Sequence, residues 1–206
     1  MSNTSAPNGF QYFGRQEGGS PTVGYTIRKV KADNATAIGF GDPVTQINTG
    51  YVTLSAADTL SIFGIFAGCS YLNSSVGSTR WSPNWPGGTQ GSDATCYIIS
   101  DPQALFAVQS NNTAITFGDI GLNINPAIGT PATTAAGGYS TSTVAQSTLA
   151  TTNGPISTAS PLPWMTTPRP PLPEGVHSLV STSVTTPSLG AKTSSVGKSA
   201  SGSPAT

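Results

Sequence analysis

The sequence predicts a mainly β protein built around a small antiparallel β-barrel or jelly-roll-like domain. Short apolar runs alternate with polar positions, and glycine, proline, asparagine or aspartate separates one run from the next. The runs are also rich in β-branched and aromatic residues, which favour strands over helices. We expect an extended N-terminal arm over residues 1–22, the β-domain over 23–153, and an irregular or partner-ordered tail over 154–206.

The predicted arm has little regular pattern. It contains the glycine-rich stretch FGRQEGG and three aromatic residues, Phe10, Tyr12 and Phe13, with no period that would bury one face. An arm that carries aromatic side chains is expected to dock on another surface, and the start of a strand is the alternative.

The β-domain begins with two predicted strand regions. In TVGYTIRKVKA, alternation places Tyr25 and Ile27 on one side of a strand and Arg28 and Val30 on the other. The next region is VTQINTGYVTLS, in which Gly50 marks a turn or bulge.

The strongest core signal is the segment TLSIFGIFAGCSYLN. Both of its faces are largely apolar, so we expect a strand that is buried on both sides. Strict alternation places Phe66 on one face with Gly64 and Gly68, and places Cys69 and Tyr71 on the other. The recurring glycines indicate that another backbone comes close to this strand.

Further predicted strands are DATCYIIS, ALFAVQS and TAITF. From about residue 110 to 153 the pattern weakens, although alternation survives in LNIN and STVAQSTL. After Asn153 the chain is rich in proline, serine and threonine, and such a segment buries too little apolar surface to order itself alone.

The loop STRWSPNWPGGTQ places Trp81 and Trp85 four residues apart, where prolines and glycines prevent a regular helix. Three interpretations are open. The rings cap the open end of the barrel, or they form a stacking platform for a sugar with only Asn84 and Gln90 nearby. Alternatively they anchor a protein interface together with Arg80, because tryptophan and arginine concentrate binding energy at interfaces.

The charge content argues against several partner classes. Only 8% of the residues are charged, against about 25% in ordinary soluble domains, and eight Lys and Arg balance eight Asp and Glu. No net field therefore favours nucleic acid or an anionic membrane. The first residues lack the pattern of a secretion signal, and the longest apolar run is too short to cross a bilayer. We expect a surface that works packed against other proteins, and a secreted protein is the alternative that the same composition suits.

Catalytic and metal-binding patterns do not emerge from the sequence. It has no G-x-S-x-G motif, and its single histidine, His177, stands in the proline-rich tail, so we expect no enzymatic activity, metal or cofactor. The aspartates stand beside typical turn residues, where carboxylates form local hydrogen bonds. Cys69 and Cys96 fall on different predicted strands and are able to touch, but two reduced core cysteines are the expected state.

One stretch of about residues 40–112 has a familiar order of segments. The apolar strand IFGIFAGCSY leads through a polar turn into an aromatic loop with PGG, and then into DATCYIISDPQALFAVQ. In this order and spacing the segments resemble the cement, or decoration, proteins of tailed-bacteriophage capsids. The resemblance does not extend to the tail.

The resemblance implies a virion structural protein without enzymatic activity. Such a protein binds the outer surface of the phage head in many copies and stabilises contacts between major capsid protein subunits. It implies the major capsid protein as partner, a symmetric homo-oligomer such as a dimer or trimer, and assembly in the host cytoplasm. The alternative from a different class is a carbohydrate-binding module of a tail fibre or adhesin.

Overall fold

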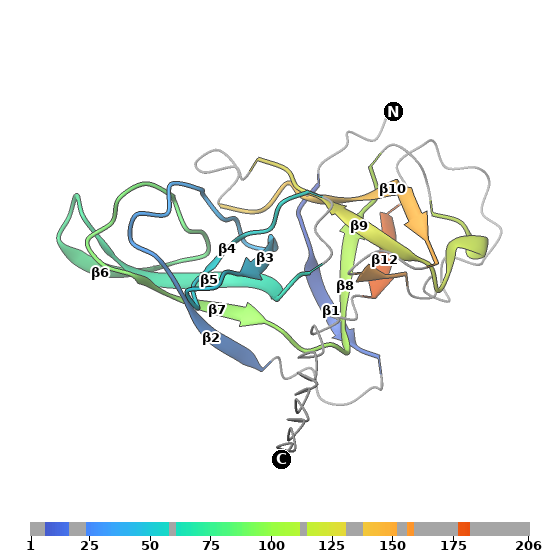
Figure 1. Cartoon of the computed structure of the whole chain (residues 1–206), viewed down its shortest axis with the longest axis horizontal. Coiled ribbons are helices and arrows are strands. Elements are labelled where there is room, and N and C mark those ends of the chain that lie inside the picture. The colour runs from blue at the N-terminus through green and yellow to red at the C-terminus, as the bar shows by residue number, and fades with distance from the viewer. Residues whose placement is uncertain are drawn as a thin grey trace, which may run out of the picture.

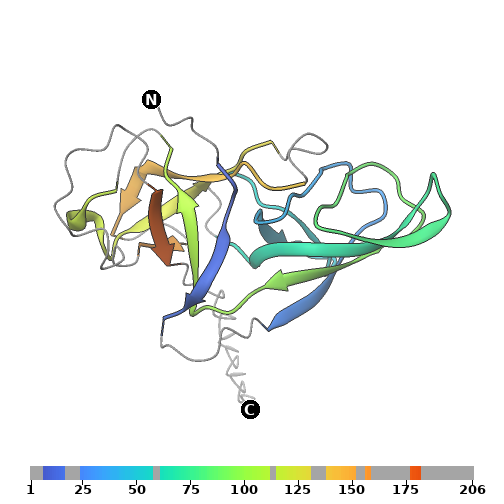
Figure 2. The same ribbon diagram turned by 180° about the vertical axis from the view of Figure 1, so that it is seen from behind.

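Two curled antiparallel sheets contain the strands of the part of the chain that the structure describes (Figure 1). The computed structural model describes residues 7–16, 24–57, 61–111, 115–130, 138–151, 156–158 and 177–181. The prediction of a mainly β, antiparallel fold is confirmed, but neither sheet closes into a barrel. Figure 2 shows from behind that the two sheets lie side by side along the long axis of the molecule.

Sheet A has the strand order β1-β8-β12-β11-β9-β10. Its strands are β1 (Gln11–Arg15), β8 (Ala104–Gln109), β9 (Asn123–Ala127), β10 (Thr143–Ala150), β11 (Ile156–Ser157) and β12 (His177–Ser181). A bridge between Ser110 and Val144 brings β10 back toward the end of β8, so the sheet curls. Inside the curl lies a buried apolar cluster that includes Phe10, Phe106, Val108, Ile124, Val144 and Ile156.

Sheet B has the order β2-β7-β5-β3-β4, and β6 pairs with β5 beside this path. Its strands are β2 (Tyr25–Val30), β3 (Pro43–Gln46), β4 (Val52–Leu54), β5 (Gly64–Asn73), β6 (Ser78–Ser82) and β7 (Ala94–Ile99). A second buried cluster lies on its inner side and includes Val30, Val44, Phe66, Tyr71, Trp85 and Ile98. A short 3₁₀ turn, Phe117–Asp119, follows β8 in the part of the chain described.

Strand β5 separates the two clusters, which explains its two apolar faces. Ile65 contacts the sheet A cluster together with Ile99 of β7, whereas Phe66 and Ile98 belong to the sheet B cluster. A Cβ atom on Gly64 would lie 2.4 Å from the carbonyl oxygen of Ile99, so this position must be glycine for the strands to meet. The predicted strand buried on both sides, with a close backbone approach at a glycine, is confirmed.

The predicted strict alternation within this strand is wrong. The β5–β7 register shifts between Phe66 and Cys69, where Gly68 has a φ of 122°. The β-bulge adds one residue to β5, so Phe66, Cys69 and Tyr71 all belong to the same cluster. Ser70 consequently lies on the opposite face from Phe66.

The predicted extended arm, expected to dock or to begin a strand, is described over residues 7–16. Residues 11–15 form β1, which pairs with β8, and Phe10 is buried against the edge of the Phe106 ring. The alternative interpretation, the start of a strand, describes this segment. The aromatic residues have no clear period because β1 is bulged between Tyr12 and Gly14.

The tail contributes two strands that its composition does not predict. Ile156 of β11 is buried in the sheet A cluster, and β12 pairs through its main chain with β8 over five residues. Main-chain pairing needs no apolar pattern, so this segment takes its place between β8 and β11 through main-chain hydrogen bonds. Residues 159–176 and 182–206 of the predicted tail lie outside the described residues.

The two sheets are joined around one buried carboxylate, that of Asp42. Its Oδ2 accepts a hydrogen bond from the Gly39 N–H at 2.7 Å, and its Oδ1 accepts hydrogen bonds from the hydroxyls of Ser140 and of Ser142, the latter at 2.7 Å. The Asp42 carbonyl also accepts the N–H of Phe66. The turn before β3, the segment before β10 and the centre of β5 are therefore linked at a single residue.

Burial raises the pKa of the Asp42 carboxyl above its usual value, although its three hydrogen bonds act in the opposite direction. The folded pKa therefore lies above the unfolded pKa. Between these two values the folded state binds more protons than the unfolded state, so stability decreases as the pH rises through that window.

We expect Asp42→Ala to lower the free energy of unfolding by about 3 kcal/mol or more, because three buried donors then lose their acceptor. Urea denaturation measures this loss. A variant that unfolds at the same urea concentration as the unsubstituted chain would show that Asp42 does not hold the sheets together.

Asp42→Asn is the matched control, since it keeps the size of the side chain and cannot titrate. We expect the unsubstituted chain to gain stability relative to Asp42→Asn as the pH falls from neutral through the carboxylate range. A pH-independent difference between the two chains would contradict the raised pKa.

The strand β12 gives a second prediction. A chain that ends at Thr158 lacks β12, which lies between β8 and β11, and we expect its melting temperature to fall by roughly 5 °C or more because sheet A is divided. A chain that ends at Ser181 keeps every described strand and is the control. Equal melting temperatures for the two truncated chains would mean that β12 does not stabilise the sheet.

Candidate functional site

The outer face of sheet B carries a continuous set of side chains across four strands. Trp81 of β6 lies opposite Ser70 of β5, Ser70 lies opposite Thr95 of β7, and Thr95 lies opposite Lys29 of β2. Directly opposed residues in antiparallel strands project from the same face. One row of side chains therefore crosses four of the six strands of sheet B, from β6 through β5 and β7 to β2.

A second row lies further along β2 and β7. Ile27 is opposite Tyr97, and Tyr25 packs edge-on against the Tyr97 ring with centroids 6.2 Å apart. We call the two rows together the open face, which consists of Tyr25, Ile27, Lys29, Ser70, Trp81, Thr95 and Tyr97.

The open face combines large exposed aromatic and aliphatic side chains with three polar members, Lys29, Ser70 and Thr95. Relative exposure is 54% for Tyr25, 58% for Ile27 and 59% for Trp81, which are high values for large apolar side chains. Contiguous exposed apolar surface is uncommon on monomeric soluble proteins and indicates interaction sites. The open face is therefore the candidate functional site.

The β-bulge in β5 positions Trp81. A Cβ atom at Gly68 would lie 3.0 Å from Cζ2 of the indole and 3.1 Å from the carbonyl oxygen of Ser82. The indole therefore lies over the bulge, in space that only glycine leaves free. This contact holds the ring against the sheet while most of it stays exposed.

Sheet A covers one end of the same face and leaves the rest open. Ile99 of β7 and Ile65 of β5 are buried in the sheet A cluster, and Ile99 lies opposite Tyr25 in the β2–β7 register. In this pair Ile99 is buried and Tyr25 is exposed. The large apolar side chains of this face therefore extend beyond the part that sheet A covers.

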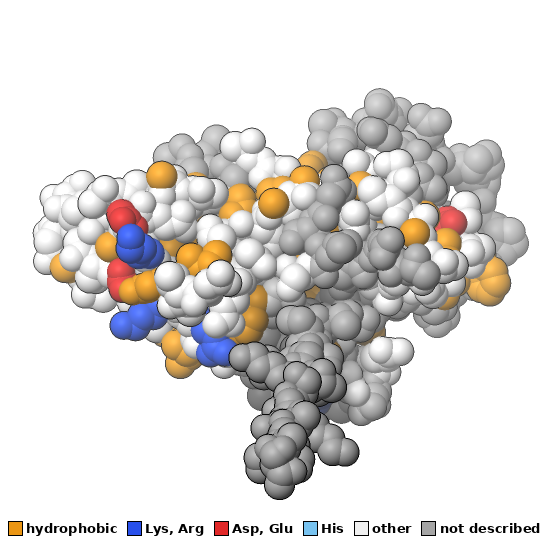
Figure 3. Space-filling view, in the orientation of Figure 1, with side chains coloured by type: hydrophobic (Ala, Val, Ile, Leu, Met, Phe, Trp, Pro, Cys, Tyr) orange, Lys and Arg blue, Asp and Glu red, His pale blue; other side chains and the backbone are white. Residues whose placement is uncertain are grey.

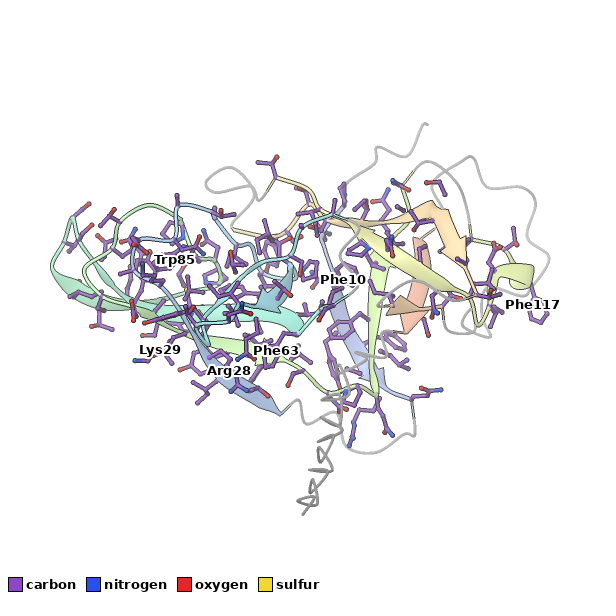
Figure 4. The ribbon with its side chains drawn as sticks, in the orientation of Figure 1. Phe10, Arg28, Lys29, Phe63, Trp85 and Phe117 are labelled. Carbon is purple, nitrogen blue, oxygen red and sulfur yellow. The ribbon has the colours of Figure 1, made fainter. Side chains whose placement is uncertain are left out.

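Few charged side chains lie near the open face, and most of them contact other parts of the protein. Lys29 is the one charged member of the open face, whereas Arg28 lies on the other side of β2, 4.9 Å from the Phe63 ring centroid (Figure 4). At the end of β2, Lys31 pairs with Asp33 at 2.8 Å. In Figure 3 the visible charged side chains gather mainly over this part of sheet B.

The nearby Asp93 carboxylate is occupied by internal donors. Its oxygens accept hydrogen bonds from the Tyr51 hydroxyl at 2.8 Å and from the Ala32 N–H at 2.9 Å. These two hydrogen bonds lower the pKa of Asp93, and the first raises the pKa of Tyr51. Asp93 is therefore a structural carboxylate that secures the chain after β2.

The two tryptophans of the loop have different environments. Trp85 is completely buried: its Nε1–H donates to the Asn34 carbonyl at 3.0 Å, and its ring packs edge-on against Tyr71. Its main chain pairs with Ile38. Trp85 thus has a core role in the sheet B cluster, although the described strands form no barrel end for the rings to cap, whereas Trp81 is exposed on the open face.

The other predicted interface residues are dispersed. Phe10 is buried in the sheet A cluster, and Tyr12 is partly buried beside the Phe106 ring. Phe13 is exposed on the outer strand β1, and Arg80 is exposed on β6. The alternation of β6 directs Arg80 away from the face that carries Trp81.

Of the open face, the sequence analysis named only Trp81 as an interface residue and missed the other six members, among them Tyr25, Ile27 and Tyr97. Alternation places Tyr25 and Ile27 together on one side of their strand, and this grouping holds in the structure. Alternation alone does not say which side of a strand faces the core, so it did not mark this side as exposed.

The polar side chains offer little for catalysis or metal binding. No group of three or more His, Cys, Asp or Glu residues suited to a metal ion occurs among the residues that the structure describes. Each described aspartate accepts hydrogen bonds or forms an ion pair, either within a turn, as Asp119 does with Thr116, or across the fold, as Asp101 does with Arg15. His177 begins β12, and Asp58 lies outside the described residues.

No protein-family model matches the chain, and no curated protein or solved structure matches it either. Among the described residues, no helix is long and apolar enough to span a membrane.

The difference between the tryptophans is directly testable. We expect Trp85→Ala to reduce the free energy of unfolding by about 3–5 kcal/mol, because it opens a cavity in the sheet B cluster. Trp81→Ala is the matched variant from the same loop and is expected to change stability by about 1 kcal/mol or less. Equal losses in chemical denaturation would contradict the assignment of one ring to the core and the other to the surface.

Proposed function

We propose that the chain is a non-enzymatic structural protein of a phage virion, a decoration protein that binds the outer surface of the capsid and stabilises contacts between major capsid protein subunits. The observation that carries the proposal is the open face, an exposed sheet surface rich in large apolar and aromatic side chains with one charged residue. The resemblance of residues 40–112 to capsid cement proteins supports the major capsid protein as the partner.

The chemistry of the open face suits a permanent protein contact. Trp81, Tyr25 and Tyr97 supply large rigid side chains, which lose little conformational entropy when they are covered. Lys29 adds one charge at the edge of the apolar area. Attachment through such a surface depends on apolar burial and is only weakly screened by salt.

Repetition would strengthen a modest contact. A decoration protein occupies many equivalent sites on a capsid, and a symmetric oligomer binds several of them at once through avidity. We propose a homo-oligomer, a dimer or trimer on the capsid, for this reason.

The protein assembles in the host cytoplasm, and two free buried cysteines suit that reducing compartment.

A carbohydrate-binding module is the second candidate, because three aromatic side chains on one sheet face also suit stacking against sugars. Sugar sites add polar side chains beside the rings, however, and the two amides near the loop are already used. Asn84 Oδ1 accepts the Ser82 hydroxyl at 2.8 Å, and Gln90 Nε2 donates to the Gly87 carbonyl at 3.1 Å. The open face therefore favours a protein partner.

The test of the function is the copy number of the chain in purified particles of the phage that encodes it. Mass spectrometry measures its amount relative to the major capsid protein, and we expect a ratio of the same order. A few copies per particle would support a tail-fibre component with a sugar-binding role. Complete absence from particles would refute a virion protein.

The role of the open face is tested with undecorated capsids. We expect Trp81→Ala and Ile27→Ser each to weaken binding by roughly tenfold or more, with little dependence on salt. Phe117→Ala is the control, because Phe117 is 80% exposed but lies at the opposite end of the molecule (Figure 4). Unchanged binding by both open-face variants would exclude this surface as the attachment site.

A further inference from the structure

The two cysteines of the protein face each other in the interior of sheet B. Cys69 of β5 lies directly opposite Cys96 of β7, and both belong to the sheet B cluster with no exposed surface. Both are free. Their thiols interact weakly with main-chain carbonyls, Cys69 with Asn84 at 3.6 Å and Cys96 with Ala94 at 3.9 Å.

The β-bulge creates this juxtaposition. Phe66 pairs with Ile98, so a regular ladder would place Gly68 opposite Cys96 two residues later. The extra residue in β5 shifts the register, and Cys69 becomes the partner of Cys96 instead. The local backbone that supports Trp81 on the outside therefore also brings the two thiols together on the inside.

The geometry of directly opposed residues suits a disulfide. Opposed Cα atoms in an antiparallel pair are about 4.5–5.5 Å apart and their side chains share a face. Cystine bridges span Cα separations of about 4.4–6.8 Å. The register of Cys69 and Cys96 is therefore compatible with a cystine bridge between the two strands.

We propose that Cys69 and Cys96 are a site of oxidative modification, at which a cross-strand disulfide forms within the folded chain when it leaves a reducing compartment. The oxidant is a small peroxide. One thiolate attacks the O–O bond of hydrogen peroxide, which gives a sulfenic acid and, after protonation, water. The second thiol sulfur then attacks the sulfenic sulfur, forms the S–S bond and releases a second water. Two electrons pass from the two sulfurs to the peroxide.

The reaction is slow because of the surroundings of the pair. The hydrogen bond with Cys69 and the burial of the site raise the pKa of the Cys96 thiol, so little of its reactive thiolate exists at neutral pH. The pair consequently stays reduced during synthesis and folding. Once formed, the bond encloses β6 and the Trp85 loop, and it links the two long central strands of sheet B.

The test uses the full chain, folded and free of reductant, incubated with hydrogen peroxide. We expect the intact mass to fall by two hydrogen atoms, the product to remain monomeric on a non-reducing gel, and a peptide pair to join the two cysteines. The melting temperature should rise by roughly 5 °C or more and return to its starting value after addition of dithiothreitol.

Cys69→Ala and Cys96→Ala are the controls, and neither should lose the two hydrogen atoms; if one fails to fold, the other serves alone. If both cysteines of the treated chain still react with iodoacetamide after unfolding, the proposal is wrong. It is equally overturned if the bond forms only in unfolded protein, or if the bridged chain melts at the same or a lower temperature.

Discussion

The buried carboxylate of Asp42 is the contact on which the arrangement of the two sheets depends. Three segments of the chain meet at this residue. Gly39 and Ser142 donate hydrogen bonds to its carboxylate, and the N–H of Phe66 donates to its main-chain carbonyl. A carboxylate in the interior is costly unless every oxygen is hydrogen-bonded, and here both are. Because β5 is tied to this residue through the Phe66 N–H, the position of sheet B against sheet A is fixed at the same point.

The fixed position of sheet B determines which of its surface is left uncovered. Sheet A buries Ile65 and Ile99, and the face beyond them stays open although it carries Tyr25, Ile27 and Trp81. The single bulge in β5 has effects on both sides of this sheet. Outside, it makes room for the indole of Trp81, and inside, it aligns Cys69 with Cys96. The proposed attachment surface and the proposed disulfide site thus depend on one irregular ladder.

The sequence predicts the strands that have an apolar pattern. It does not predict the local structure where a single inserted residue or a pairing with a distant segment determines the conformation. The segment of β5 is apolar on both faces, and its burial between two clusters follows from that composition. The alternating pattern does not reveal the bulge. One added residue moves every later side chain of the strand to the opposite face, so strict alternation assigns those side chains wrongly. β12 is invisible as well, since its pairing with β8 uses main-chain groups that every residue has. The separation of Trp81 from Trp85 depends on the path of the loop, which is set by the distant pairing of Trp85 with Ile38.

The most direct measurement is hydroxyl-radical footprinting of the chain, free in solution and bound to capsids. Tyr25 and Trp81 are exposed in the free chain and react readily, and we expect strong protection of both when the chain is bound. Phe117, which is exposed far from the open face, should be oxidised equally in the two states. Unchanged oxidation of Tyr25 and Trp81 on the capsid would contradict attachment through the open face of sheet B.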